Sequence, residues 1–286
     1  MDVFDLYAKI SLDSSEYDKG LDDAAAKGSG FGSKLAGGLS SAVSTVAKVG
    51  AAAVGVASGA VVAMTKQAVS SFANYEQLVG GVETLFGNTA DAVVAKAKGA
   101  FETAGLSAND YMETVTSFSA SLLQSVSGDT EKAAQYADMA ITDMSDNANK
   151  MGSSMESIQF AYQGFAKQNY TMLDNLKLGY GGTKEEMQRL LNDAQKLSGQ
   201  KFDLSSYADV VEAIHVIQEN MGIAGTTAKE AASTISGSLN MTKAAWENVL
   251  TAIGTGDMGG ISSAIDNLVE SVGQLIDRAN NFIDGS

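Results

Sequence analysis

The chain has 286 residues, enough for one or two domains with a buried core. It contains no cysteine and a single histidine, His215, which excludes disulfides, thiol nucleophiles, cysteine-ligated metals and any site that needs two imidazoles. The formal net charge of −15 disfavours binding to nucleic-acid phosphates, so no direct nucleic-acid binding is expected. Proline is absent too, which favours long helices.

Residues 1–27 are predicted to form an N-terminal strand followed by a helix. Apolar and polar side chains alternate over residues 3–12, with Phe4, Leu6 and Ile10 on one side, and a period of two is typical of a half-buried β-strand. A second comparable strand is not visible, so we expect this one to pair with another subunit.

Residues 28–70 are rich in glycine, alanine, serine and valine and contain no acidic residue. The 17 residues from Val49 to Thr65 carry no charge, which is the lower edge of membrane-spanning length. Two interpretations stay open: a buried or self-associating helix, and a transmembrane helix that inserts at some stage. The membrane interpretation depends on Val49, Val54, Gly55, Val56, Gly59, Val61, Val62 and Met64.

Residues 71–253 are predicted to form a compact, all-α, multi-helix bundle. Apolar side chains recur there with a period of 3.6 residues, and such stripes bury against one another. Short connections between the stripes predict antiparallel neighbours. The residues expected to cap the helices are Ser107, either Asp129 or Thr130, Thr183, Ser206 and Thr227.

A glycine-rich hinge is predicted at residues 254–260, followed by an amphipathic helix over residues 261–286. An apolar stripe with no partner after it favours self-association, or the start of a ruler region that continues beyond it. The stripe consists of Ile261, Ile265, Leu268, Val269, Val272, Leu275 and Ile276.

No residue is predicted to be catalytic, to bind a cofactor or to ligate a metal. The glycine-rich stretch at 178–184 has the order Gly-Thr-Lys between helices, whereas a phosphate loop needs Gly-Lys-Ser/Thr after a strand, so a turn capped by Thr183 is expected. His215 lies beside an apolar helix stripe and the sequence nominates no partner for it. Asp138, Asp143 and Asp146 are expected on a solvated helix face.

Four long strings resemble the N-terminal conserved region of phage tail tape measure proteins, the type found in long-tailed phages and prophages of Gram-positive bacteria. The opening LYAKISLDSSEYDKGLDDAAAKGSGFGSKL (6–35) also fits that family, so the resemblance covers about residues 1–253. The four strings begin FANYEQLVGGVETLFGN (72–94), AGLSANDYMETVTSF (104–152), FAYQGFAKQNYTMLDN (160–199) and SSYADVVEAIHVIQENM (205–250).

This resemblance implies a structural protein that acts in tail assembly. Tape measure proteins occupy the lumen of the tail tube, their length sets the tail length, and they leave ahead of the DNA during ejection, in some phages through a channel in the host membrane. The implied partners are the tail tube protein, tail assembly chaperones and tail tip or baseplate proteins. The implied locations are the virion tail lumen, the host cytoplasm during assembly and the host membrane during ejection.

The length departs from that family, whose members usually continue into extended helical ruler segments. At about 1.5 Å per residue, the whole chain as one helix would span only about 430 Å, so we expect the N-terminal piece of a ruler or the remnant of a decayed gene. The alternative function is a pore-forming or membrane-inserting helical protein unrelated to tails. A helical cell-wall hydrolase is a third and weaker alternative.

Overall fold

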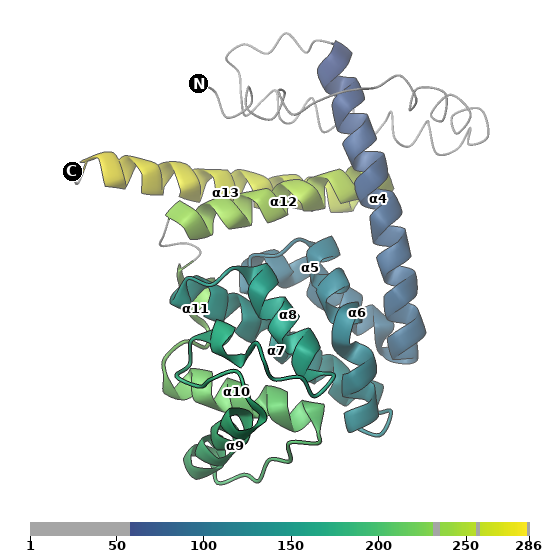
Figure 1. Ribbon diagram of the computed structural model, residues 1–286. Helices are drawn as coiled ribbons and strands as arrows, with labels where there is room; N and C mark the ends of the chain where they lie inside the picture. Colours follow the sequence, from purple (N-terminus) through teal and green to yellow (C-terminus); the bar gives the residue numbers. More distant parts are fainter. Residues whose placement is uncertain (1–57, 231–234, 256–257, 285–286) are drawn as a thin grey trace. The chain divides into compact units, whose positions relative to one another are not determined.

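The computed structural model describes residues 58–230, 235–255 and 258–284, and all regular secondary structure in these residues is helical, as the sequence predicts (Figure 1). The predicted strand at 3–12 and the remainder of residues 1–57 lie outside the described residues. The chain divides into two units, residues 1–73 with 249–266, and residues 74–248 with 267–286.

Most of the helices follow one another with short connections, which agrees with the prediction of a multi-helix fold, whereas the connection from α8 to α9 is long and contains η2. They are α4 (Ser58–Phe86), α5 (Ala90–Thr103), α6 (Ala108–Ser125), α7 (Thr130–Met151), α8 (Met155–Phe165), α9 (Lys184–Ser198), α10 (Tyr207–Asn220), α11 (Thr226–Glu230), α12 (Ile235–Thr255) and α13 (Met258–Asp284). Two 3₁₀ turns, η1 (Gly87–Thr89) and η2 (Leu173–Leu176), lie between them.

Four of the five predicted helix caps are confirmed. The side chains of Ser107, Asp129, Thr183 and Ser206 each accept a hydrogen bond from the backbone N–H three residues later, at 3.0–3.3 Å. Such a cap satisfies one of the backbone donors that a helix start leaves without an intrahelical partner. Thr227 does not cap, because α11 already begins at Thr226.

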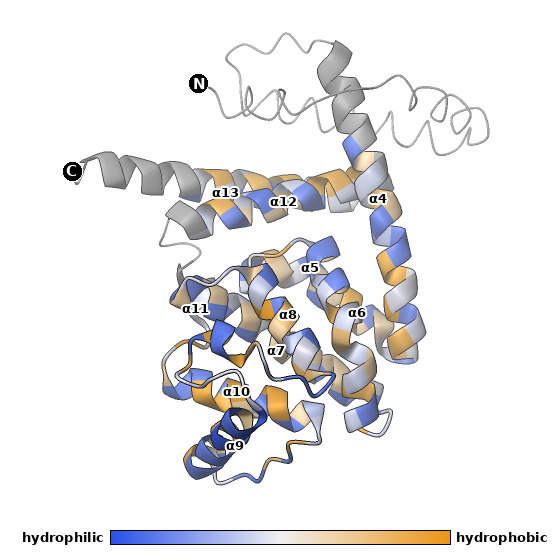
Figure 2. Cartoon of the chain, in the orientation of Figure 1, coloured by the Kyte–Doolittle hydropathy of each residue, from blue (hydrophilic) through white to orange (hydrophobic). Residues whose placement is uncertain are grey.

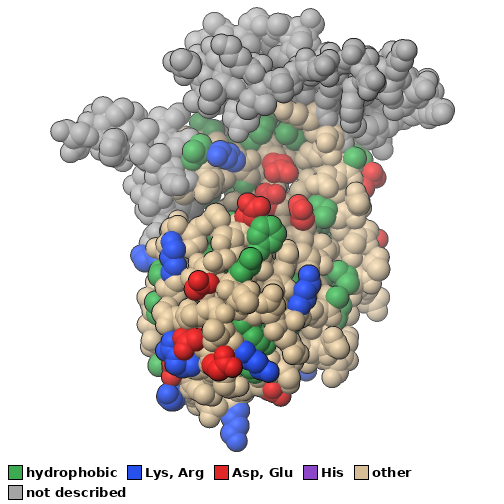
Figure 3. Space-filling view, in the orientation of Figure 1, with side chains coloured by type: hydrophobic (Ala, Val, Ile, Leu, Met, Phe, Trp, Pro, Cys, Tyr) green, Lys and Arg blue, Asp and Glu red, His purple; other side chains and the backbone are tan. Residues whose placement is uncertain are grey.

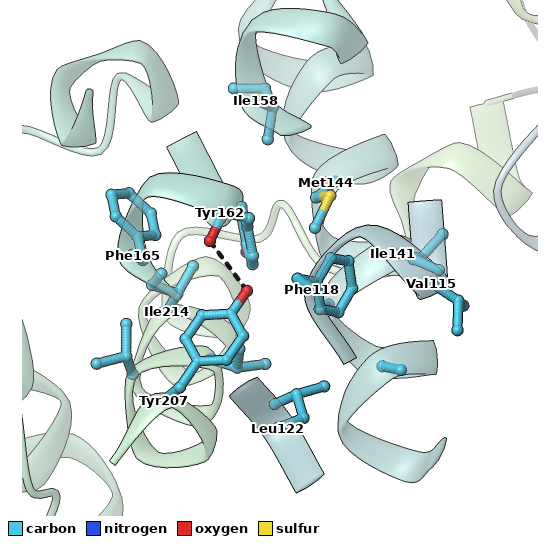
Figure 4. Close-up of a cluster of buried hydrophobic side chains, with 14 of the residues drawn as sticks. Val115, Phe118, Leu122, Ile141, Met144, Ile158, Tyr162, Phe165, Tyr207 and Ile214 are labelled. Carbon is cyan, nitrogen blue, oxygen red and sulfur yellow. Dashed lines mark hydrogen bonds between the residues drawn. The ribbon is translucent and has the colours of Figure 1, made fainter. Parts of the chain in front are cut away.

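The core of the larger unit lies where α6, α7, α8 and α10 meet (Figure 4). The ring of Phe118 on α6 meets the ring of Tyr207 on α10 edge to face, with centroids 6.1 Å apart. The Tyr207 hydroxyl donates a 3.1 Å hydrogen bond to the backbone carbonyl of Tyr162 on α8. This bond lets a buried phenol remain satisfied among apolar side chains.

Helix α9 has one buried and one charged face. It packs on α10 through Met187, Leu190, Leu191 and Ala194, and its remaining residues are mostly hydrophilic, as the blue colour of α9 in Figure 2 shows. Ion pairs join Glu186 to Arg189 and Asp193 to Lys196 on that outer face. Blue and red side chains accordingly lie side by side at the lower end of Figure 3.

The predicted hinge at 254–260 is narrower than expected, because α12 continues to Thr255 and α13 begins at Met258. Gly254 on α12 allows the backbone of this helix to lie close to α4 in the smaller unit. A Cβ placed there would lie 2.2 Å from the Cβ of Phe72 and 2.9 Å from the carbonyl oxygen of Ala68, both on α4. The hydroxyls of Ser71 and Thr251 are 2.7 Å apart at the same contact between α4 and α12.

Two members of the predicted self-association stripe on α13, Ile261 and Ile265, are buried within a single chain, with 2% and 3% of their surface exposed. Their burial disfavours direct contacts between copies through these two residues, and self-association itself stays a prediction. Leu268 is half-buried and Val272 is 36% exposed. The side chains of Val269, Leu275 and Ile276 lie outside the described residues, and their role stays a prediction.

The predicted membrane segment, 49–65, lies mostly outside what the structure describes. Its residues 58–65 form the first turns of α4, but their side chains are not among those described. In the described stretches 58–230, 235–255 and 258–284, no helix is both long enough and apolar enough to cross a bilayer.

Two adjacent glycines in the turn before α9 allow a sharp stability test. A Cβ at Gly182 would lie 2.2 Å from the carbonyl oxygen of Thr171, whereas a Cβ at Gly181 would meet only the side chain of Glu186, at 3.5 Å. Gly182→Ala should therefore lower the free energy of unfolding by about 1–3 kcal/mol in urea denaturation, the usual cost of overpacking. Gly181→Ala is the control and should change it by much less; equal losses would contradict the packing described.

Candidate functional site

The middle of α7 is enclosed on all sides. Five consecutive residues, from Asp143 to Asn147, are buried, and five residues are more than one helical turn. This segment, residues 143–147, is called the polar turn here because four of its five side chains are polar. Buried polar groups must find partners in the protein. Helix α7 touches α5, α6, α8, α10 and α11, which supply those partners.

Two side chains of the polar turn hold backbone carbonyls in other segments. The Ser145 hydroxyl donates to the carbonyl of Ala104, just after α5, at 2.5 Å. The Asn147 amide donates to the carbonyl of Leu176, the last residue of η2, at 2.9 Å. Helix α7 thus fixes the positions of two loops that are 29 and 41 residues away in the sequence.

Asp146 holds the beginning of α11. Its carboxylate accepts hydrogen bonds from the backbone N–H groups of Gly225, at 2.5 Å, and Thr227, at 2.6 Å. Asp146 is only 1% exposed, so these two charge-assisted bonds compensate the cost of burying its charge. A side chain distant in sequence therefore does for α11 what a local cap does for the other helices.

Asp143 binds His215 on α10. Nδ1 of His215 lies 2.8 Å from Oδ1 and 3.1 Å from Oδ2 of Asp143, and Nε2 lies 3.4 Å from Oε1 of Glu219. The side chain of Asp143 is 1% exposed, that of His215 28%, and that of Glu219 61%. The imidazole therefore links a buried carboxylate to the surface.

The two partners change each other's protonation. Burial raises the pKa of Asp143 to about 6, although the hydrogen bond from His215 opposes that rise. The same hydrogen bond raises the pKa of His215 above its usual value, against the effect of partial burial. The hydrogen bond between them therefore favours the form in which a buried carboxylate faces an imidazolium.

A pocket of about 340 Å³ opens beside this pair. The residues around it include Asp138, Thr142, Asp143, Asp146, His215 and Gly225. Each of its three carboxylates already has a protein partner: Asp138 accepts from the Tyr111 hydroxyl and from the Lys96 ammonium, both at 2.8 Å. The pocket therefore offers solvent access to His215 rather than a free charge for a ligand.

The predicted solvated face of α7 is wrong for two of its three aspartates. Asp143 and Asp146 are buried, whereas Asp138 keeps 29% of its side chain exposed. The apolar stripe of α7 marks only one of its buried faces, and α10 and α11 cover another. No group of three or more histidine, aspartate or glutamate side chains within the described stretches is arranged to hold a metal ion.

His215 has a partner that the sequence did not nominate. Asp143 is 72 residues away, and no local spacing joins the two. The only signal was chemical: a lone histidine on a half-buried helix needs a hydrogen-bond partner, and an aspartate-rich helix offers one.

The glycine-rich stretch at 178–184 is a turn followed by a capped helix, as predicted. Gly179 has a φ of +86°, a left-handed conformation that suits glycine. The guanidinium of Arg189 donates to its carbonyl oxygen at 2.8 Å and lies 4.3 Å from the ring centre of Tyr180. Glu186 accepts a hydrogen bond from the backbone N–H of Gly181 at 3.0 Å.

Comparisons of this chain with protein-family models, with curated proteins and with solved structures find no match.

The two hydrogen bonds of Asp146 can be tested with the almost isosteric substitution Asp146→Asn. In Asp146→Asn one carboxylate oxygen becomes an NH₂ group that faces a backbone N–H, so one of the two bonds to residues 225 and 227 is lost. We expect the free energy of unfolding to fall by about 1–3 kcal/mol, measured by urea denaturation. Asp174→Asn, at an exposed position on η2, is the control. An Asp146→Asn chain as stable as this control would contradict the role given to Asp146.

Proposed function

We propose that this chain is the N-terminal part of a tail tape measure protein and that it acts in tail assembly as a structural, non-catalytic component. The observation that carries the proposal is the resemblance of four long strings between residues 72 and 250 to that family. These strings run from the second half of α4 through α12, the same part of the chain that forms most of the larger unit.

The geometry supports an attachment role for this unit in preference to a measuring one. Its central helix, α7, has 22 residues, or about 33 Å at 1.5 Å per residue, and it is surrounded by other helices. A ruler needs helices that continue end to end. A compact helical unit instead provides a fixed surface, which a tail tube protein, an assembly chaperone or a tip protein can bind.

The chemistry of the polar turn supports a structural role. The carboxylates of Asp143 and Asp146 are both held by protein groups, and His215 is held by Asp143. Helix-to-helix bonds of this kind fix the fold. The formal net charge of −15 suits a protein that shares a conduit with DNA without binding its phosphates.

The test is made in the phage or prophage that carries the gene, with two matched substitutions. Phe118 is 2% exposed in the core, and Phe160 is 49% exposed on α8. Phe118→Asp places a charge in the core and should unfold the unit, whereas Phe160→Asp should leave it folded. We expect particles with Phe118→Asp to lack tails and those with Phe160→Asp to keep them, as counted by negative-stain electron microscopy.

Mass spectrometry of purified tails supplies the second readout, and it should detect the chain in tails of the parent phage. Tails in normal number and of normal length with Phe118→Asp would overturn the proposal. Leakage of dye from liposomes on addition of the purified parent chain would then favour the membrane-inserting alternative.

A further inference from the structure

The contact between α7 and α10 contains a single charged bridge whose two members both titrate near neutral pH. Asp143 supplies the buried carboxylate and His215 the imidazole, 2.8 Å away. His215 is also the only histidine of the chain. Because 28% of its side chain is exposed and it borders a pocket of about 340 Å³, protons can reach it without unfolding.

Four other titratable groups surround this pair, and two of them, Glu212 and Glu219, favour the protonated state of the imidazole. The four groups are Asp146 on α7, Glu212 and Glu219 on α10, and Tyr162 on α8. The carboxylates among them raise the pKa of His215 or of Asp143. Asp138, on the wall of the same pocket, binds Lys96 and Tyr111. The ammonium group of Lys96 is therefore paired with Asp138 and not with Asp143.

We propose that the Asp143–His215 pair is a proton-operated lock between α7 and α10, closed when His215 is protonated and weakened when it loses its proton. In the weakened state Asp143 keeps a buried negative charge without a cationic partner. Such a charge is costly, and separation of the two helices relieves the cost by admitting water. The polar turn would then loosen at the side that faces α10.

The direction of the pH effect follows from proton binding. The pKa of His215 is raised in the folded chain, so its contribution is fully present below about pH 6.5 and is lost as the pH rises through the folded value. The pKa of Asp143 is raised as well, to about 6, so the folded chain also holds this proton where the unfolded chain has released it. Both groups make the folded state less stable as the pH rises.

The first measurement is an NMR titration of the His215 ring C–H signals in the full chain, because one histidine gives one unambiguous set. We expect a midpoint above 6.5 in the parent chain. In Asp143→Asn the midpoint should fall by about one unit or more, since an opposite charge at this distance typically shifts a pKa by 1–3 units. Glu219→Gln is the matched control, and because Glu219 is 61% exposed its effect should be less than half as large.

The second measurement tests the lock itself by hydrogen exchange of the α10 amides between pH 6 and pH 8, corrected for intrinsic exchange. Protection in the parent chain should fall as the pH rises, by about tenfold for each unit of pKa difference. In the double variant Asp143→Asn, His215→Gln this pH dependence should be absent, because neither member of the pair can then titrate. Asp143→Asn alone should reduce the dependence, which keeps the test decisive if the double variant does not fold.

Two results would overturn the proposal. One is a His215 midpoint that is the same in the parent chain and in Asp143→Asn, or that moves equally in Glu219→Gln. The other is an α10 protection in the double variant, or in Asp143→Asn if the double variant does not fold, that still falls between pH 6 and pH 8 as it does in the parent chain.

Discussion

The fold of the larger unit depends on the enclosure of α7. A helix that is covered over more than a full turn cannot present any side to water, so every polar side chain in that turn needs a partner within the protein. Ser145, Asp146, the amide N–H of Asn147 and Asp143 meet this requirement by binding four separate segments: the end of α5, the start of α11, η2 and α10, whereas the amide oxygen of Asn147 has no partner. A hydrogen bond contributes modestly when made, but a buried group left without one costs more, so these bonds act mainly by specifying which packing is allowed.

The need of these buried side chains for partners also bears on the proposed function, because one of the partners titrates. Three of the four segments are held through backbone groups, which do not titrate. The bond to His215 differs, because its partner carries a charge that depends on protonation. Under the proposed function, the chain would have to be stably folded while tube proteins assemble around it and would later have to leave the tube. A fold held by fixed bonds on three sides and by a titrating bond on the fourth is suited to both demands.

The sequence predicts local features well and distant ones poorly. The period of 3.6 residues identifies the helices, and the caps at Ser107, Asp129, Thr183 and Ser206 lie where a polar side chain can reach the backbone three residues later. The Asp143–His215 pair could not be predicted, because it joins residues 72 positions apart through tertiary packing. An aspartate looks the same in sequence whether water or a helix covers it, which is why Asp143 and Asp146 were expected on a solvated face.

The most direct test of the enclosure of α7 is native-state hydrogen exchange of the full chain, read helix by helix. If α7 is held on all sides, the amides of residues 140–148 should be among the slowest to exchange and should open only with the whole unit. Those of α9, which has one solvated face, should exchange earlier. Exchange of residues 140–148 as fast as that of α9 would contradict the account, because it would mean that the polar turn opens locally and does not hold the surrounding segments together.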